Sequence, residues 1–325
     1  MRFLAVDDDP AFLEIIRDFM EGDARHELQT AASATEALDM VQASPQSFDA
    51  FLLDIQMPGM DGVELCSALR KMKPFRRTPI IMVTAAADRD FIDDAFAAGA
   101  TDYMSKPLDP LEWKARIRMV EELHEERQRT VALAQQARSA NRDYQEPIEF
   151  ETRVSLYGQD NVIEYLALEN YLLTLDGRGL FAHAATGFHV ENALQIYKKA
   201  TPSAFVETMA DVAAAIFDGL KAHNLMFAYA GAGDFVAVTP RQAAIDNEAL
   251  EAAINSSLAE FESIYAADGL PTPRVQVGDQ ERSSLFGKRR ANVILQQAIW
   301  KARGANQQRM SEEHHLSQVR EALKH

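Results

Sequence analysis

Short apolar runs alternate with amphipathic stretches throughout residues 1–109, and this alternation restricts the possible folds more than any other feature of the chain. Four runs are predicted to be strands: "RFLAV", "DAFLLD", "PIIMVTA" and "DYMSKP". Four stretches are predicted to be helices: "PAFLEIIRDFMEG", "ATEALDMVQAS", "GVELCSALRKM" and "DRDFIDDAFAAGA". Strands that alternate with helices pair in parallel and carry helices on both faces of the sheet. We therefore expect a doubly wound α/β domain over residues 1–120.

Polar residues of complementary kinds stand at the ends of these strands. They are Asp7, Asp8, Asp9, Asp54, Thr84 and Lys106. Any one of the acids alone would be interpreted as a loop residue or a helix cap. In an open parallel sheet, however, the carboxyl ends of the strands meet at a switch point where ligands bind. We therefore expect the set to lie together.

The chemistry of such a group is specific. Clustered carboxylates repel one another, so they favour a hard divalent cation, and their oxygen atoms suit Mg²⁺. A carboxylate beside Mg²⁺ can attack a phosphoryl group, while a lysine neutralises charge on the transferring oxygens. A threonine hydroxyl can donate a hydrogen bond to the product. This pattern indicates a site that accepts a phosphoryl group.

The segments that carry these residues resemble the receiver domain of two-component response regulators, which has a flavodoxin-like fold. The matching segments are "VDDDP", "LLDIQMPGMDG", "VTA" and "DYMSKP". The resemblance implies that Asp54 is the phospho-acceptor and that Asp7 and Asp8 complete an acidic pocket. It implies that Asp8, Asp54 and the backbone carbonyl of Gln56 bind Mg²⁺.

The same resemblance implies the residues of the switch and the source of the phosphoryl group. Lys106 would contact the phosphoryl group, and the Lys106–Pro107 bond is expected to be cis. Thr84 would move toward the phosphate while Tyr103 swings inward. The expected partner is a sensor histidine kinase or a phosphotransfer protein.

Residues 110–146 are predicted to form a long linker helix that extends the last helix of the receiver. They contain no glycine and no proline after Pro110, and they are rich in Glu, Arg, Gln and Ala. Heptad positions in this stretch are only partly apolar. A dimeric coiled coil and a solvated linker helix are both compatible with that pattern, so a homodimer through this helix and the receiver stays open.

Residues 148–308 are predicted to form a second α/β region, and residues 309–325 a charged tail. The predicted strands are "FHVENALQIY", "LMFAYAGAGDFVAV" and "PRVQVG". The predicted helices are "SAFVETMADVAAAIFDGLKAH", "NEALEAAINSSLAEFESIYAA" and "RRANVILQQAIWKARG". The order is therefore β-α-ββ-α-β-α.

Several segments of this region resemble the GGDEF domain of diguanylate cyclases. The signature turn would be Gly231-Ala232-Gly233-Asp234-Phe235. "NYLLTLDGRGLF" matches the entry pattern of the family in part, and "ANVILQQAIWKARGAN" echoes its last helix. The resemblance implies a palm-like α/β domain with a mostly antiparallel sheet.

The departures from that family concern its polar chemistry. The family aligns two GTP molecules with two Mg²⁺ ions, held by an Asp on the first strand and by the third and fourth signature residues. Our alignment places Gln195 where that first Asp should be, and the third signature residue is Gly233. Only Asp234 remains of the metal set. An amide and a glycine do not hold a hard cation as carboxylates do, so the cyclase site is expected to be degenerate.

Composition narrows the classes of partner. The 325 residues carry a formal net charge of −16, which would repel nucleic acid, so DNA is not expected as a partner. The single cysteine excludes a disulfide framework. His183 and His189 lie near no cysteine or acid pair in the sequence and are interpreted as surface residues. No signal peptide or membrane-spanning run is present, so we expect a cytoplasmic location.

Three hypotheses follow for the function of the second region. In the first, it has no catalytic activity and passes the signal to an unknown output protein by protein–protein interaction. In the second, it is an active diguanylate cyclase that makes cyclic di-GMP. In the third, it is a sensor that binds GTP or cyclic di-GMP without turnover. We rank the first highest, because the receiver pattern is intact and the cyclase pattern is not.

Overall fold

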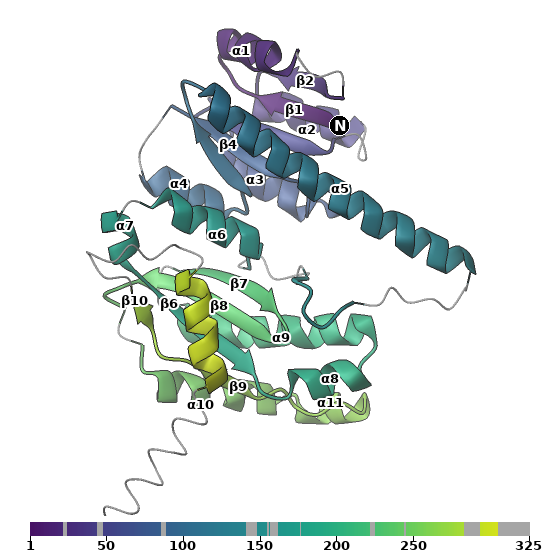
Figure 1. The fold of residues 1–325 in the computed structure, drawn as a ribbon, viewed down its shortest axis with the longest axis vertical. Coiled ribbons are helices and arrows are strands. Elements are labelled where there is room, and N and C mark those ends of the chain that lie inside the picture. The colour runs from purple at the N-terminus through teal and green to yellow at the C-terminus, as the bar shows by residue number, and fades with distance from the viewer. Residues whose placement is uncertain are drawn as a thin grey trace, which may run out of the picture. The chain divides into compact units, whose positions relative to one another are not determined.

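The computed structural model divides the chain into two compact units, Met1–Glu146 and Pro147–His325 (Figure 1). It describes residues 1–21, 25–43, 48–85, 89–140, 148–154, 156, 162–175, 177–221, 225–243, 245–282 and 293–304. The predicted tail 309–325 and the last six residues predicted for the linker helix lie outside these ranges. Among the described residues, no helix combines the length and apolar character needed to cross a bilayer.

The first unit is a five-stranded parallel sheet in the order β2-β1-β3-β4-β5. Its strands are β1 Arg2–Val6, β2 Glu27–Ala31, β3 Ala50–Asp54, β4 Ile80–Thr84 and β5 Asp102–Ser105. Its helices are α1 Pro10–Met20, α2 Ala34–Ala43, α3 Gly62–Lys71, the short 3₁₀ helix η1 Lys73–Phe75, α4 Arg89–Ala97 and α5 Pro110–Ala140. The expected flavodoxin-like parallel sheet is confirmed.

Helices cover both faces of this sheet, so the inner strands are buried on both sides. Alternate residues of β1 and β3 pack in two separate cores, one with α1 and α5 and the other with α2 and α3. This explains why β3 and β4 are continuous apolar runs. The sequence prediction missed β2, an edge strand whose "ELQTA" is mostly half-exposed and therefore has no apolar run.

One long helix, α5, runs over Pro110–Ala140 within the range predicted for the linker helix. Trp113, Ile117 and Val120 form its buried stripe against the parallel sheet of the first unit, at the spacing of one helix face. After Val120 the side chains described, through Arg129, are half-buried or exposed. The first part of α5 therefore belongs to the core of the first unit, and residues 121–129 do not.

The second unit is an α/β structure with an antiparallel sheet, in the order β10-β6-β8-β7 with β9 also paired to β6. Its strands are β6 His183–Val190, β7 Met226–Gly231, β8 Asp234–Pro240, β9 Val275–Val277 and β10 Glu281–Arg282. Its helices are α6 Tyr165–Thr174, α7 Gly177–Phe181, α8 Ala193–Lys199, α9 Pro202–Leu220, α10 Asn247–Ala259, α11 Glu262–Ala267 and a helix at 293–304.

Two layers of helices sandwich this sheet. Phe188 and Val190 of β6 share the main core with α9 and α10. Gly187 points to the opposite face, where an added Cβ would stand 2.2 Å from the carbonyl oxygen of Ala298. The helix at 293–304 therefore lies directly against β6 because Gly187 has no side chain.

The predicted first strand of this unit, "FHVENALQIY", is wrong over its second half. The strand ends at Val190, and Gln195 lies exposed on helix α8 rather than on a strand. The physical reason is the spacing of Ala193 and Ile196, which are buried three residues apart on one helix face. The predicted equivalence of Gln195 with a strand acid is therefore also wrong.

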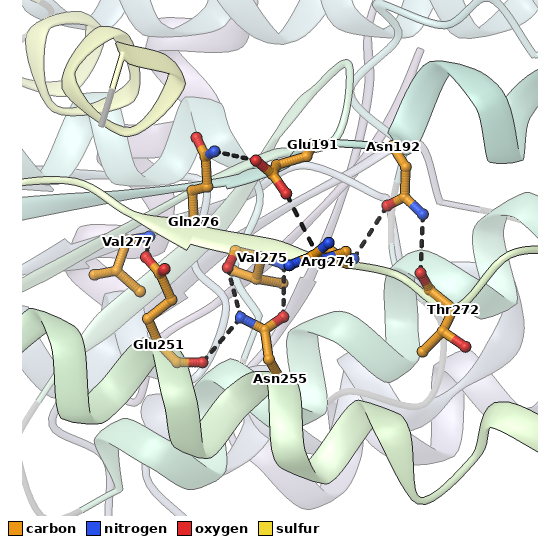
Figure 2. A network of polar contacts seen from close by, with 9 residues as sticks. All are labelled: Glu191, Asn192, Glu251, Asn255, Thr272, Arg274, Val275, Gln276 and Val277. Carbon is orange, nitrogen blue, oxygen red and sulfur yellow. Dashed lines mark hydrogen bonds and ion pairs between the residues drawn. The ribbon is translucent and has the colours of Figure 1, made fainter. Parts of the chain in front are cut away.

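Side chains of α10 close the free edge of β9 (Figure 2). Asn255 accepts a hydrogen bond from the Val275 N–H at 2.9 Å and donates one to the Val275 carbonyl at 2.8 Å. Glu251 accepts from the Val277 N–H at 2.8 Å. An open strand edge invites pairing with another chain, and these side chains occupy that edge.

Asn255→Ala should lower the free energy of unfolding by about 2 kcal/mol, because the variant loses both hydrogen bonds to Val275 in a part-buried position. Chemical denaturation monitored by circular dichroism measures the change. Ser256→Ala, at an exposed position of the same helix, is the matched control and should change stability by no more than ~0.5 kcal/mol. Equal effects of the two substitutions would show that Asn255 does not hold β9.

Candidate functional site

The strand ends of the first unit meet as the sequence predicts. Asp7 follows β1, Asp54 ends β3, Thr84 ends β4 and Lys106 follows β5. The register of the sheet aligns these ends: Asp54 stands beside Val83, and Thr84 stands beside Ser105. Four different strands therefore deliver polar side chains to one edge.

Lys106 joins two of the acids. Its Nζ lies 2.6 Å from Asp7 Oδ2 and 2.8 Å from Asp54 Oδ1. Asp7 and Asp54 are buried, with exposed fractions of 1% and 5%. The same ammonium lies 4.1 Å from the centre of the Phe12 ring, which adds a cation–π contact. The lysine is thus fixed between a buried acid pair and an aromatic face.

Burial and charge shift the pKa values of Asp54 and Lys106 in opposite directions. Burial raises the pKa of the Asp54 carboxyl, although the hydrogen bond and the charge of Lys106 act in the other direction. For Lys106, burial would lower the pKa, but its hydrogen bonds to Asp54 and Asp7 outweigh it and the pKa is raised. The lysine therefore stays charged at neutral pH and supplies a fixed positive charge beside Asp54.

Three carboxylates converge at this edge. Asp7, Asp8 and Asp54 each offer one oxygen atom, and these atoms lie within 4.8 Å of one another. Asp8 is exposed, while the other two are buried. A set of hard oxygen donors that is open on one side fits a Mg²⁺ ion, which keeps several waters when bound. In the described part of the chain, no other cluster of His, Cys, Asp or Glu meets the same criterion.

Asp9, the last aspartate of the run, caps a helix instead of facing the cluster. Asp9 is the N-cap of α1, and its Oδ1 accepts a hydrogen bond from the Ala11 N–H at 2.9 Å. Its own N–H donates to Asp7 Oδ1 at 3.0 Å. The third acid of the run therefore anchors the helix and orients Asp7, whereas the first two point their oxygens at the site.

Gly62 is a supporting residue that the sequence interpretation did not single out. It begins α3, and an added Cβ would stand 1.9 Å from the carbonyl oxygen of Asp54. Its N–H donates to the Ile55 carbonyl at 3.0 Å. The start of α3 is therefore pressed against the end of β3, which holds the backbone of Asp54 in place.

The remaining predicted site residues surround this centre. Thr84 is buried at the end of β4, and Gln56 lies exposed in the loop after β3. Tyr103 on β5 is half-buried, edge-on to Phe96 with ring centres 6.5 Å apart. The Lys106–Pro107 bond is cis, as the sequence resemblance implies.

A second buried acid lies at the other end of β5. Asp102 is fully buried, and its Oδ2 lies 2.6 Å from Arg116 Nη1 on α5. Its Oδ1 accepts from the Tyr103 N–H at 2.8 Å. Burial raises the pKa of Asp102 to about 6, against the opposing charge of Arg116. This pair fastens α5 to β5 and was not predicted.

Asp102 makes stability depend on pH. Its pKa is about 6 in the folded chain and near ~3.9 in an unfolded one, so the folded state binds the proton more tightly. The free energy of unfolding should therefore fall as pH rises from about 4 to about 6, by on the order of 3 kcal/mol.

Asp102→Asn should abolish this decrease in the free energy of unfolding between about pH 4 and about pH 6. Denaturant titrations of wild type and variant at several pH values would measure the difference. Asp18→Asn, at an exposed acid of α1, should leave the pH profile of wild type unchanged. Parallel profiles for wild type and Asp102→Asn would contradict the assignment.

The turn at 231–235 in the second unit has a different character. Gly231, Ala232 and Gly233 all have positive φ, at 90°, 55° and 79°. Asp234, the one acid of the turn, is buried with 2% exposed. Arg303 Nε lies 3.2 and 3.0 Å from its two oxygens, and Arg303 Nη2 also bonds Oδ2. Its Oδ1 lies 2.8 Å from His189 Nδ1.

Asp234 is therefore fully occupied by side chains of its own unit. His189 stands directly opposite it in the β6–β8 register, so His189, rather than Gln195, faces Asp234. The interpretation of His189 as a surface residue is wrong, because it is half-buried against this carboxylate. The hydrogen bonds to Asp234 raise the pKa of Arg303, which keeps the arginine charged. No sequence spacing links residues 189, 234 and 303, so only the fold reveals the cluster.

The comparisons with known proteins concern the first unit. Residues 3–118 match the family model of the response regulator receiver domain. The transcriptional regulatory protein YvrH of Bacillus subtilis is 40% identical over 116 residues, which cover 35% of this chain and 46% of YvrH. The histidine-protein kinase BarA of Escherichia coli K12 is 36% identical over 109 residues, 34% of this chain and 12% of BarA. The matched region thus spans about half the length of YvrH.

Solved structures are similar over the same share of the chain. The chemotaxis protein CheY4 of Vibrio cholerae is 31% identical, with a TM-score of 0.34, and the match covers 37% of this chain and 97% of CheY4. A CheY-like receiver domain protein of Methanospirillum hungatei is 32% identical, with a TM-score of 0.35, covering 38% and 97%.

Proposed function

Because residues 3–118 belong to the response regulator receiver family, we propose that this chain accepts a phosphoryl group on Asp54 and passes the signal to its second unit. The observation that carries the proposal is the buried Asp54 carboxylate, which lies in one cluster with Asp7, Asp8 and Lys106. The phosphoryl donor is a sensor histidine kinase, a phosphotransfer protein or a small acyl phosphate.

In the proposed step, one oxygen of the Asp54 carboxylate attacks the phosphorus of the donor. When the donor is a phosphohistidine, the P–N bond breaks, and the imidazole leaves with the electron pair and takes a proton. The new O–P bond makes an acyl phosphate on Asp54. Lys106 Nζ, already 2.8 Å from Asp54 Oδ1, compensates the charge of the product, and the Thr84 hydroxyl donates a hydrogen bond to it.

Mg²⁺ is the proposed cofactor of this step. Asp7, Asp8, Asp54 and the Gln56 carbonyl would hold it, and the three converging carboxylate oxygens fit a hard divalent cation. When bound, the ion would neutralise charge on the transferring phosphoryl oxygens. The residues of the chain hold the nucleophile: Asp9 orients Asp7, and Gly62 fixes the backbone of Asp54.

The second unit is proposed to be a degenerate GGDEF-like domain that acts through a partner protein. The β-α-ββ-α-β order and the glycine turn support the relationship, and the state of Asp234 supports the loss of catalysis. A carboxylate already paired with Arg303 and His189 is poorly placed to bind a cation, because Arg303 would compete with it. The alternatives remain an active cyclase and a sensor of GTP or cyclic di-GMP.

Labelling by a small acyl phosphate should require a divalent cation. We expect removal of Mg²⁺ with a chelator to lower the rate at least ~100-fold, because the acid cluster then lacks its counter-charge. Intact-mass spectrometry counts the phosphoryl groups, and hydroxylamine should release them because they are acyl phosphates. Equal rates with and without the chelator would exclude the proposed metal role.

The proposed function of the second unit is tested on the protein preparation that is used for labelling. A pull-down that compares phosphorylated wild type with Asp54→Asn should recover a protein partner that depends on Asp54. A GTP turnover assay should give no cyclic di-GMP in either state. Formation of cyclic di-GMP would overturn the non-catalytic output and favour the cyclase alternative.

A further inference from the structure

A short segment of the second unit lies across the glycine turn. We call residues 148–154 the strap. The Phe150 carbonyl accepts a hydrogen bond from the Ala232 N–H at 2.9 Å. The Glu151 carbonyl comes so close to Gly231 that a Cβ there would stand 2.2 Å from it. The backbone of the strap therefore rests directly on the backbone of the turn.

Two side chains of the strap fit sites on the unit. The Phe150 ring packs on Tyr197 and Phe205, with ring centres 5.3 and 6.2 Å away. Tyr197 also donates its hydroxyl to the Ile148 carbonyl at 2.8 Å. The unit thus holds the strap first through the Phe150 ring, which packs on two aromatic side chains.

The second fitted side chain lies three residues later. The Arg153 guanidinium stacks over the Tyr165 ring at 4.0 Å, and Arg153 Nη1 lies 3.7 Å from Glu169 Oε2. Stacking on a ring together with a carboxylate is specific for arginine. The strap therefore presents to this surface an aromatic residue and, three positions later, an arginine.

These contacts account for the glycine turn without a nucleotide. Gly231 must be glycine because the strap lies on it, and Gly233 because an added Cβ would stand 2.3 Å from the Ala193 Cβ. The turn's amide donors are also used: Ala232 N–H binds the strap, and Gly233 N–H donates to the Tyr229 hydroxyl at 3.2 Å. The turn is thus shaped to hold a peptide backbone. In the strap that backbone bends, because the Thr152 N–H donates to the Glu149 carbonyl at 3.0 Å.

The strap is held less firmly than the core of its unit. Among the described residues, one backbone hydrogen bond joins it to the turn, and the side chains from Glu151 to Arg153 are exposed. It precedes the first helix of its unit and follows α5 in the chain. Phe150 and Val154 pack against the core of the unit but are only partly buried. A segment held by partly buried contacts opens at a lower free energy than the core does.

We infer that the surface beneath the strap is a peptide-docking site, and that a partner protein binds it when the strap leaves. The partner would offer a segment that bends as the strap does, with an aromatic residue and, three residues later, an arginine. This inference rests on the proposed function only in assuming that the second unit acts through a protein partner. The strap is then an internal competitor of that partner.

The test uses a labelled peptide with the sequence of residues 147–154, "PIEFETRV", added to the full chain. The variant Phe150→Ala/Arg153→Ala should bind the peptide at least ~10-fold more tightly than wild type, by fluorescence anisotropy, because its own strap no longer competes. Phe181→Ala, another half-buried phenylalanine of this unit, is the control and should behave as wild type. A peptide with alanine for its phenylalanine should not bind the variant. Equal affinity for all three chains, or no binding to the variant, would overturn the inference.

Wild-type protein gives an independent measurement that needs no variant to fold. The Ala232 amide, bonded to the strap, should exchange its hydrogen at least ~10-fold faster than the Val190 amide, which donates to the Gly233 carbonyl within the sheet. Equal exchange rates would mean that the strap opens only with the whole unit, and would overturn its release.

The outcomes separate this inference from the proposed function. Peptide binding without phosphoryl labelling of Asp54 would remove the phosphoryl acceptor and leave the docking site. Labelling of Asp54 without peptide binding would retain the acceptor and remove the docking site.

Discussion

Asp54→Asn is expected to lower phosphoryl labelling by at least ~100-fold, because an amide oxygen is a far weaker nucleophile than a carboxylate. The substitution keeps the shape of the side chain at a position with only 5% exposed. Labelling with a small acyl phosphate in the presence of Mg²⁺, followed by intact-mass spectrometry, measures the loss.

The run of three aspartates offers a matched control. Asp9→Asn makes the same chemical change two residues from Asp7, but Asp9 caps α1, and asparagine caps helices as well as aspartate does. This variant should be labelled within a few-fold of wild type. Label on Asp54→Asn would show that another residue accepts the phosphoryl group. An equal loss in Asp9→Asn would show that the loss is not specific to the Asp54 carboxylate.

Loss of label in Asp54→Asn should not reflect unfolding. Burial raises the pKa of the Asp54 carboxyl, so ionised Asp54 is costly to the folded state at neutral pH, and a neutral amide removes that cost. Lys106 keeps its ion pair with Asp7 at 2.6 Å. We expect the free energy of unfolding of Asp54→Asn to equal that of wild type or to be slightly higher.

Gly62→Ala is expected to lower the free energy of unfolding of the receiver by about 3 kcal/mol or more and to slow labelling of Asp54. The added Cβ would stand 1.9 Å from the Asp54 carbonyl oxygen and 2.8 Å from its carbonyl carbon. Both are backbone atoms, so no side-chain rotation relieves the clash, and either α3 or the end of β3 must move. Denaturation and labelling rates on one preparation measure both effects.

Gly59, in the loop just before α3, separates the effect of this clash from the effect of losing a glycine. Gly59 has φ +82°, and nothing lies within 4 Å of an added Cβ. Gly59→Ala should therefore cost only the ~1–2 kcal/mol of a strained backbone and leave labelling nearly intact. If the two variants behave alike, the contact between Gly62 and Asp54 does not position the nucleophile.

The sequence was sufficient for most of the receiver, because its inner strands are buried on both faces and appear as apolar runs with polar residues at their ends. It was insufficient for β2, an edge strand whose side chains are mostly half-exposed. It also missed the Asp102–Arg116 pair, since burial of an acid at the start of a strand has no local signal.

The second unit was predictable in its hairpin, its long helices and the short strand β9, which lies within the predicted "PRVQVG". The β7–β8 hairpin was predicted because two strands flank a glycine turn. The first strand was misplaced because a short helix, Ala193–Lys199, has the composition of a strand. The partners of Asp234 come from residues 189 and 303, and contacts across such separations follow from the register of the sheet rather than from spacing.

The pairing of β6 with three other strands has a consequence for synthesis of the chain. β6 ends at Val190, yet β9 and β10, which complete one of its edges, begin only at Val275 and Glu281. This strand has eight residues and is mostly buried in the folded unit. During translation, its edge stays unpaired until about ninety later residues have been made. A product that ends before Val275 would keep the edge open permanently, so premature termination there should yield an aggregating fragment rather than a smaller folded unit.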